Sequence, residues 1–296
     1  ESSAASDVYK RQQIGTAEPP WKCPECFTMQ TIEMEHFTME LLESKENANR
    51  DKIILQLHGG GYVGAMRNAY RMFAGLYNEV SHGMSVLTPD YRVAPEHPYP
   101  AALEDTIAAY HWLLEQGYPA EKIVVAGDSA GGGLALALCL WLKNHKEPLP
   151  SGVIAMSPWT DLTISGESVE TNFEKDPLFG KTRDSMLYNK DYLGDNDPTN
   201  EYISPLFGDY EGFPPLLIQV GSYEMLLSDS TRVAKKAKEA GGKVKLSIYE
   251  GMFHVFQMAM LLMPESKKAW AEIKRFLHYL DTEENEMQNI SKEEKA

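Results

Sequence analysis

The chain has 296 residues, 43% of them hydrophobic, and a formal net charge of −15 at pH 7. This charge argues against nucleic acids and anionic membranes as partners. The sequence contains no secretory signal and no apolar run of about 18 residues, the length that a transmembrane helix requires, so we expect a cytoplasmic protein. The length allows either one large α/β domain or two small domains.

The first 50 residues show weaker patterns than the rest of the chain. Residues 1–13 begin without Met and have no regular period, so we expect a non-native leader there. Residues 14–50 form an N-terminal segment. Within it, polar and apolar residues nearly alternate from Thr28 to Leu42, which predicts an edge strand.

The three cysteines do not indicate a disulfide framework, because their number is odd. Cys23 and Cys26 form a Cys-Pro-Glu-Cys pair, whereas Cys139 lies far away in a segment that is expected to be helical. A structural zinc ion would need a second such pair or histidines at ligand spacing. We therefore expect no metal, and the role of the pair stays open.

Between residues 51 and 280, short apolar runs alternate with longer amphipathic segments. Strands are predicted at residues 53–57, 84–88, 122–126, 152–156, 216–220 and 244–249. Helices are predicted at residues 68–80, 101–116, 134–142, 229–240 and 265–280. This alternation predicts an α/β domain with a mostly parallel central sheet and helices on both faces. Right-handed crossovers bring the strand-to-helix turns of such a sheet to one edge, so a ligand site is expected there.

Two segments depart from this alternation. Residues 157–215 carry many Gly, Pro, Asp and Asn residues together with aromatic residues, a composition typical of a lid inserted over the carboxyl edge of the sheet. An ordinary surface excursion of the core is the alternative. Residues 281–296 are polar and highly charged without an aromatic residue, so a disordered tail is predicted.

Gly127-Asp128-Ser129-Ala130-Gly131 lies between a predicted strand and a predicted helix. A Gly-x-Ser-x-Gly in this context is typical of a nucleophile elbow, a strained turn that holds a serine hydroxyl out toward a base and a carbonyl. Side chains at the glycine positions would collide with the strand or the helix. The free N–H groups of the helix that follows suit a developing oxyanion. Alternatively, the segment is a glycine-rich turn that only links two elements.

The strand at residues 53–57 leads directly into His58-Gly59-Gly60-Gly61-Tyr62. Three consecutive glycines can align backbone N–H groups with no Cβ in the way. Such a loop after a core strand, in a chain that also carries an elbow, favours an oxyanion hole over a flexible hinge. His58 is expected to fix this loop by hydrogen bonding.

Together with Asp90-Tyr91-Arg92-Val93-Ala94-Pro95-Glu96-His97-Pro98-Tyr99-Pro100, these motifs resemble those of the hormone-sensitive-lipase family of microbial carboxylesterases on the α/β-hydrolase fold. The resemblance runs from about residue 53 to residue 280. It implies ester hydrolysis by a Ser, an acid and a His without a cofactor, under a cap built from the N-terminal segment and the insertion. It further implies short acyl chains, acetyl to about hexanoyl, and frequent homodimers. The oxyanion donors that it implies are the N–H groups of Gly60, Gly61 and Ala130.

Ser129 is the expected nucleophile, and it needs a base within hydrogen-bonding reach. Of the eight histidines, His254 follows a late core strand, and the chain order Ser, acid, His of the fold requires a late histidine. The acid is expected after the strand at residues 216–220. The family usually has Asp-Pro-Leu here, whereas this chain has Glu224-Met225-Leu226, which puts Glu224 in the place of the acid. Asp229 is the alternative acid, although it also resembles the N-cap of the next helix.

Three hypotheses on function follow. The chain keeps a candidate for every catalytic role, so a serine carboxylesterase that acts through an acyl-enzyme is the primary one. The same groups could hydrolyse amides or deacetylate small molecules, and some relatives on this fold are non-catalytic receptors that have lost the histidine. The natural ester stays open among sugar acetates, short aliphatic esters and aryl esters.

Overall fold

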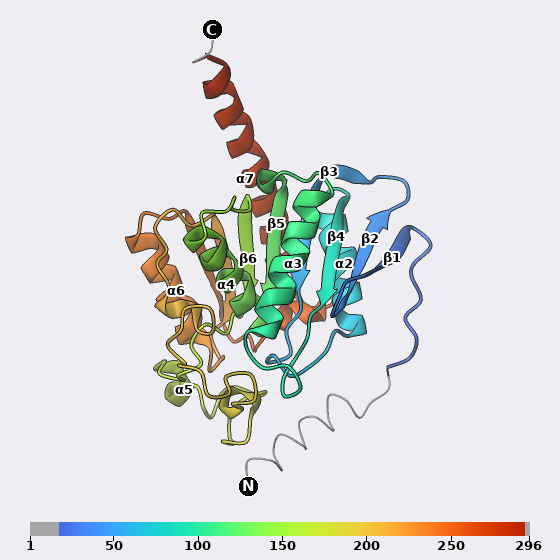
Figure 1. Ribbon diagram of the computed structural model, residues 1–296. Helices are drawn as coiled ribbons and strands as arrows, with labels where there is room; N and C mark the ends of the chain where they lie inside the picture. The colour runs from blue at the N-terminus through green and yellow to red at the C-terminus, as the bar shows by residue number, and fades with distance from the viewer. Residues whose placement is uncertain (1–17, 294–296) are drawn as a thin grey trace.

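The computed structural model describes residues 18–293 (Figure 1), so the expected leader at residues 1–13 lies outside the described residues. An eight-stranded sheet has the order β1-β2-β4-β3-β5-β6-β7-β8. Its strands are β1 (Phe27–Glu33), β2 (Thr38–Ser44), β3 (Asn49–Leu57), β4 (Met84–Asp90), β5 (Ile123–Asp128), β6 (Gly152–Met156), β7 (Leu216–Gly221) and β8 (Val244–Tyr249). The pairs β1–β2 and β2–β4 are antiparallel, and the other pairs are parallel. The predicted mostly parallel sheet is therefore confirmed.

Helices cover both faces of the sheet, as the alternation predicted. They are α2 (Asn68–Val80), α3 (Ala101–Glu115), α4 (Ala130–Asn144), α5 (Ser168–Thr171), α6 (Leu227–Glu239) and α7 (Pro264–Glu293). Buried side chains of α3, α4 and α6 belong to one apolar cluster, and those of α2 and α7 belong to a second cluster. Figure 1 shows α3, α4 and α6 in front of the sheet.

Strand β5 shows why the two clusters lie on opposite faces. Successive side chains of a strand point to opposite faces of a sheet. Ile123 and Val125 accordingly pack in the first cluster, and Val124 and Ala126 pack in the second. Because both faces are covered by helices, the strand is buried throughout, and its first four residues are an unbroken apolar run in the sequence.

The N-terminal segment differs from its prediction. The expected single edge strand at residues 28–42 is an antiparallel hairpin of β1 and β2, in which β2 also pairs with β4. The connection is closed by a hydrogen bond from the Met34 N–H to the Phe37 carbonyl. The turn contains neither Gly nor Pro, and the one break in the alternation is the polar pair Glu35-His36, a weak signal for a reversal.

The end of the last helix also differs from its prediction. Helix α7 continues past residue 280 to Glu293, through most of the segment that was expected to be a disordered tail. Residues 281–293 contain no Gly or Pro and are rich in Glu, Met, Gln and Lys, which are good helix formers. Low hydrophobicity therefore did not indicate the backbone conformation of this segment.

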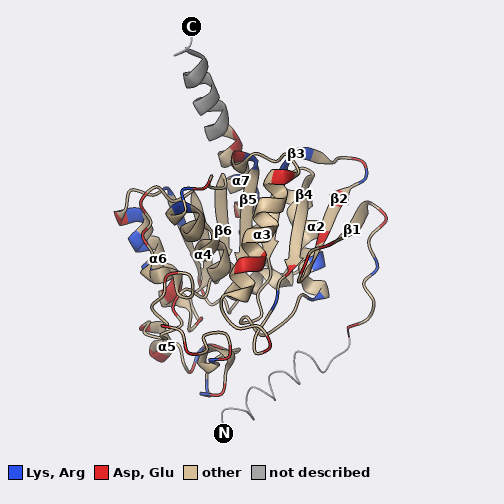
Figure 2. Cartoon of the chain, in the orientation of Figure 1, with Lys and Arg blue, Asp and Glu red and all other residues tan. Residues whose placement is uncertain are grey.

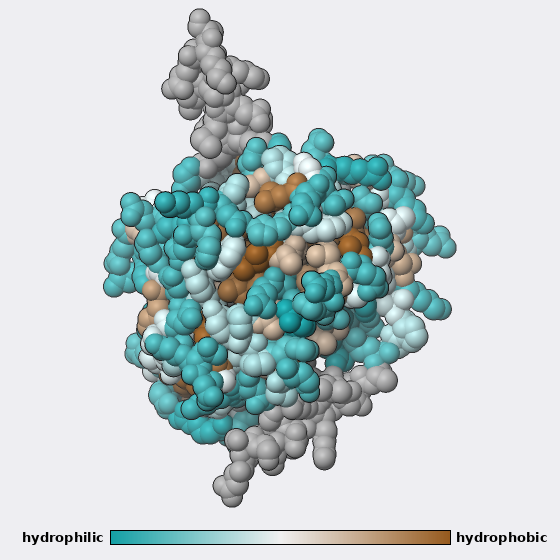
Figure 3. Space-filling model, viewed as in Figure 1, coloured by the Kyte–Doolittle hydropathy of each residue, from teal (hydrophilic) through white to brown (hydrophobic). Residues whose placement is uncertain are grey.

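Charged residues and the insertion occupy the outside of this core. Figure 2 shows Asp, Glu, Lys and Arg on helices and loops, whereas β6 carries none. The face in Figure 3 is hydrophilic over most of its area, with apolar residues in separate patches.

Within the described residues, no helix is long and apolar enough to cross a membrane. Helix α5 and the loops around it lie at the lower end of the sheet in Figure 1, where the parallel strands end, and residues 208–215 return to the start of β7.

Candidate active site

Ser129 lies on a tight turn between β5 and α4. Its backbone has φ +53° and ψ −122°, a strained conformation for a residue with a side chain. A Cβ at Gly127 would lie 2.2 Å from the Gly131 carbonyl oxygen, and a Cβ at Gly131 would lie 2.1 Å from the Leu57 carbonyl oxygen. Only glycine fits at these two positions, so the spacing of the motif follows from the close approach of β3, β5 and α4.

Three residues far apart in the sequence meet at the carboxyl edge of the sheet. His254 Nε2 lies 2.8 Å from Ser129 Oγ, and His254 Nδ1 lies 2.8 Å from Glu224 Oε2. Ser129 follows β5, Glu224 follows β7, and His254 follows β8. Because Nδ1 faces a carboxylate, this nitrogen carries the proton, and Nε2 is left to accept the serine proton. This is the arrangement that a nucleophile, a base and an orienting acid require.

The Glu224 carboxylate is completely buried, and its second oxygen is also held. Oε1 accepts hydrogen bonds from the Gly221 N–H at 2.6 Å and from the Ser157 hydroxyl at 2.7 Å. Ser157 in turn accepts a hydrogen bond at 3.1 Å from the N–H of Val255, the residue after His254. Sequence reasoning missed Ser157, and its one signal was its position at the carboxyl end of a core strand.

The alternative acid, Asp229, lies elsewhere. Its carboxylate accepts hydrogen bonds from the N–H groups of Thr160 at 2.7 Å and Asp161 at 2.9 Å. Burial raises the pKa of Asp229 to about 7. Helix α6 begins at Leu227, so Asp229 is in its first turn and is not its N-cap. Asp229 therefore attaches the start of the insertion to α6, and Glu224 is the carboxylate in contact with His254.

The glycine loop after β3 presents free donors beside the serine. Gly60 and Gly61 have φ values of +116° and +63°, which glycine adopts readily. Within residues 18–293, the N–H groups of Gly60, Gly61 and Ala130 donate to no other protein group. Ala130 is also the first residue of α4, where the helix dipole favours negative charge. These three N–H groups are therefore available to an oxyanion.

Buried polar side chains hold the glycine loop in place. The Gly59 N–H donates to Asp128 Oδ1 at 3.2 Å, and burial raises the pKa of Asp128 to about 7. His58 Nδ1 lies 2.7 Å from the Gly59 carbonyl oxygen, and the His58 ring stacks on Tyr91 at 4.0 Å. The Tyr91 hydroxyl donates to the His58 carbonyl at 2.5 Å. The loop is thus tied both to the elbow and to the residue after β4.

Two apolar side chains of the insertion reach the site. The Phe179 ring centroid lies 4.6 Å from that of His254. A Cβ at Gly61 would lie 2.8 Å from the Met186 sulfur, so Met186 packs directly on the glycine loop. Both side chains are buried. Side chains from residues 157–215 therefore pack against both the glycine loop and His254.

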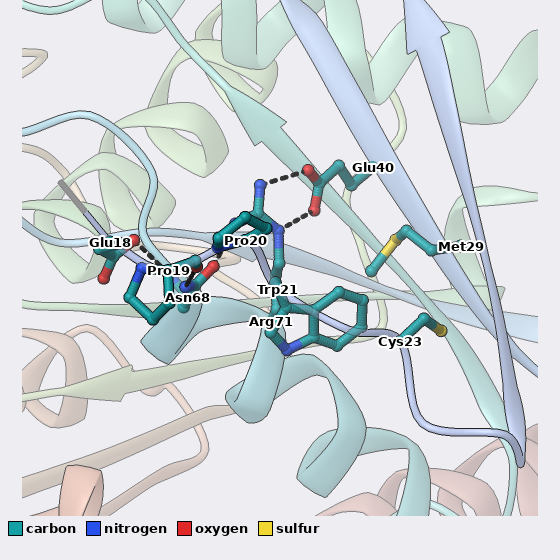
Figure 4. A pocket seen from close by; sticks show the side chains of 9 residues that line it. All are labelled: Glu18, Pro19, Pro20, Trp21, Cys23, Met29, Glu40, Asn68 and Arg71. Carbon is teal, nitrogen blue, oxygen red and sulfur yellow. Dashed lines mark hydrogen bonds and ion pairs between the residues drawn. The ribbon is translucent and has the colours of Figure 1, made fainter.

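A separate pocket lies in the N-terminal part of the molecule (Figure 4). It has a volume of about 480 Å³, and none of its lining residues belongs to the Ser129 site. Arg71 Nε and Nη2 donate to the two Glu40 oxygens at 2.8 and 2.6 Å, and the Trp21 ring lies beside them. Cys23 also lines this pocket, and Cys23 and Cys26 are free thiols. Among the described residues, no group of three or more His, Cys, Asp or Glu side chains is placed to hold a metal ion.

Comparisons with known proteins identify relatives of this chain. A family model described as alpha/beta hydrolase fold matches residues 54–258. The chain is 42% identical over 241 residues to an esterase of Acinetobacter venetianus, covering 81% of this chain and 78% of that protein. It is 38% identical over 238 residues to an acetyl-hydrolase of Streptomyces hygroscopicus, covering 80% and 78%.

A solved structure extends the similarity to three dimensions. It is that of an esterase from the bacterial hormone-sensitive lipase family, with a TM-score of 0.82 and 35% identity over 95% of this chain and 99% of that one. The residues that the family model matches, 54–258, include the elbow and the glycine loop. The chain therefore belongs to the hormone-sensitive-lipase family of the α/β-hydrolase superfamily, and it is a carboxylic ester hydrolase.

Proposed function

We propose that this esterase hydrolyses short-chain acyl esters, acetyl to about hexanoyl, through an acyl-enzyme on Ser129. The observation that carries the proposal is the continuous chain of hydrogen bonds from Ser129 through His254 to Glu224. Such a chain activates a hydroxyl that is otherwise a weak nucleophile at neutral pH.

The mechanism follows from the positions of these groups. His254 Nε2 takes the proton of Ser129, and the serine oxygen attacks the ester carbonyl carbon. The N–H groups of Gly60, Gly61 and Ala130 stabilise the negative oxygen of the tetrahedral intermediate. His254 then protonates the departing alcohol, and water releases the acyl group by the same steps in reverse order. Glu224 stabilises the imidazolium form of His254 during both halves of the reaction.

The preference for short acyl chains rests on two apolar side chains of the insertion. Met186 lies against Gly61, and Phe179 lies against His254, so both apolar side chains restrict the space beside the serine. The Streptomyces relative carries the name acetyl-hydrolase, which agrees with a small acyl group.

The test is the initial rate of hydrolysis of chromogenic esters from acetyl to long-chain acyl groups, with Ser129→Ala as the control. We expect a maximum at short chains and no burst of acyl-enzyme in the variant. A maximum at long chains would overturn the proposed preference, and undiminished turnover in Ser129→Ala would overturn the mechanism. Activity on acyl amides with none on esters would instead identify an amidase.

We also infer that two copies of the chain pair through the edge strand β8. Among residues 18–293, β8 pairs with a strand on one side only, and Ile248 on it is 49% exposed. An exposed apolar edge is a template for pairing with another strand. Light scattering should show a dimer that Ile248→Lys converts to a monomer. Met72→Lys, which alters a similarly exposed residue on α2, should leave the dimer intact.

A further inference from the structure

Three polar side chains of the insertion contact the loop that carries Glu224. Ser168, Asn172 and Asp176 follow one another at intervals of four residues, in α5 and the turn after it. All three side chains are buried, and each bonds to the backbone between β7 and the first turn of α6. Burial of three polar side chains is costly unless each one is hydrogen-bonded, so these contacts are a built interface.

Ser168 and Asn172 bind the loop on either side of the carboxylate. The Ser168 hydroxyl donates to the Met225 carbonyl at 2.6 Å and accepts from the Ser228 N–H at 2.8 Å. Asn172 Nδ2 donates to the Ser222 carbonyl at 3.0 Å and to the Glu224 carbonyl at 2.8 Å. The carbonyls of Glu224 and of the residue after it are therefore both held by the insertion.

Asp176 links the acid and the base through a single carboxylate. Its Oδ2 accepts the Met225 N–H at 2.8 Å, which fixes the peptide that follows Glu224. Its Oδ1 accepts the N–H groups of Leu178 at 2.8 Å and Phe179 at 3.0 Å. The Phe179 ring packs against His254. The Asp176 carboxylate thus binds the backbone of Met225, the residue after Glu224. It also binds the backbone of Phe179, whose ring packs against His254.

We propose that Asp176, with Asn172, is a positioning residue that fixes the backbone of Glu224 so that its carboxylate meets His254. The proposal rests on the proposed role of Glu224 as the acid. A glutamate has one more rotatable bond than an aspartate, so a fixed backbone adds to the hydrogen bonds from Ser157 and Gly221 in placing its carboxylate. The insertion is then part of the catalytic machinery as well as of the proposed acyl site.

The substitution Asp176→Asn separates the two contacts of this carboxylate. Asparagine keeps one acceptor oxygen, and the two adjacent N–H groups of Leu178 and Phe179 favour its pointing toward them. The amide NH2 group of the new side chain then faces the Met225 N–H, and two donors cannot form a hydrogen bond with each other. We expect kcat to fall about tenfold, the scale of one lost hydrogen bond to a charged group, with KM changed by less than about twofold.

The matched control is Asp161→Asn in the same insertion. Asp161 is also buried and also accepts nearby N–H groups, those of Thr163 at 3.0 Å and Ser165 at 3.1 Å, but it does not touch the Glu224 loop. We expect this variant to retain kcat at an equal loss of thermal stability. If both variants lose kcat in proportion to stability, Asp176 is merely structural and the proposal is overturned.

A double-mutant cycle with Glu224→Gln decides whether Asp176 acts through the acid. In the Glu224→Gln background, Asp176→Asn should lower kcat by less than about twofold, because the contact that it positions is already lost. If the double variant loses kcat by the product of the two single losses, the positioning role is overturned and the proposed triad stands. Wild-type kcat in Glu224→Gln alone would overturn the triad and the positioning role together. If Asp176→Asn does not fold, Asn172→Leu, which removes the donors to Ser222 and Glu224, takes its place in the cycle with the same outcomes.

Discussion

The Ser157 hydroxyl donates a hydrogen bond of 2.7 Å to Glu224 Oε1, the carboxylate oxygen that faces away from His254. The same hydroxyl accepts the Val255 N–H at 3.1 Å. Ser157 therefore connects the Glu224 carboxylate with the backbone next to His254, the residue that this carboxylate contacts. It lies at the end of β6, between the strands that precede Ser129 and Glu224 in the sheet.

Replacing this hydroxyl should slow the reaction without removing any reacting group. In Ser157→Ala, Glu224 keeps the Gly221 N–H but loses one hydrogen bond to its charged form. We expect kcat to fall about tenfold with KM nearly unchanged, measured on a short chromogenic ester. Ser151→Ala, which removes a hydroxyl bonded to the Ile123 carbonyl remote from the site, is the control. Full kcat in a folded Ser157→Ala variant would show that Gly221 alone holds the carboxylate.

The two candidate acids should respond oppositely to loss of charge. Glu224→Gln removes the carboxylate that contacts His254, so we expect kcat to fall by about three orders of magnitude. Asp229→Asn should keep most of the activity. The N–H groups of Thr160 and Asp161 both donate to one oxygen of Asp229, Oδ2, and asparagine retains an acceptor oxygen. Steady-state rates of the two purified variants give the comparison, and the reverse order would identify Asp229 as the acid.

The elbow glycines should be required for stability. A Cβ at Gly131 would lie 2.1 Å from the Leu57 carbonyl oxygen, and this backbone atom cannot move away without displacing β3. We expect Gly131→Ala to lower the free energy of unfolding in urea by about 3 kcal/mol or more. Gly212→Ala is the control, because Gly212 has open space around its Cα and a φ of +70°, so the loss should be about 1–2 kcal/mol. Equal losses in both variants would show that the elbow adapts to a side chain.

Stability should depend on pH through Asp229. Burial raises its pKa in the folded chain to about 7, from 3.8 in the unfolded chain. Between these values the folded state binds more protons than the unfolded state, so this group makes the free energy of unfolding fall as pH rises from about 4 to about 7. Asp229→Asn cannot ionise and should lack this contribution.

The measurement is the difference in unfolding free energy between Asp229→Asn and the wild-type chain at several pH values. Contributions of the other titrating groups cancel in this difference. It should therefore increase in favour of the variant as pH rises from about 4 to about 7, because only the wild-type chain must ionise the buried carboxyl. A constant difference would show that the Asp229 carboxyl has the same affinity for protons in both states.

The sequence predicted those elements whose structure is determined by residues within the element itself. The apolar run of β5, the glycines around Ser129 and the strand–helix alternation are short-range patterns, and each has a direct steric or hydrophobic cause. The reversal between Met34 and Phe37 and the extension of α7 to Glu293 were missed, because no Gly or Pro there marks a turn or a stop.

The sequence by itself determined the mostly parallel sheet, the nucleophile elbow at Ser129 and a late histidine, because periodicity and glycine spacing act within a few residues. It left two carboxylates open, and tertiary structure decided that Glu224 lies 2.8 Å from His254 while Asp229 lies in another contact. Tertiary structure alone also placed Ser157 and Asp176 beside the Glu224 loop. These contacts join side chains to residues 30 or more positions away, and such pairings depend on how the elements pack and leave no period in the sequence.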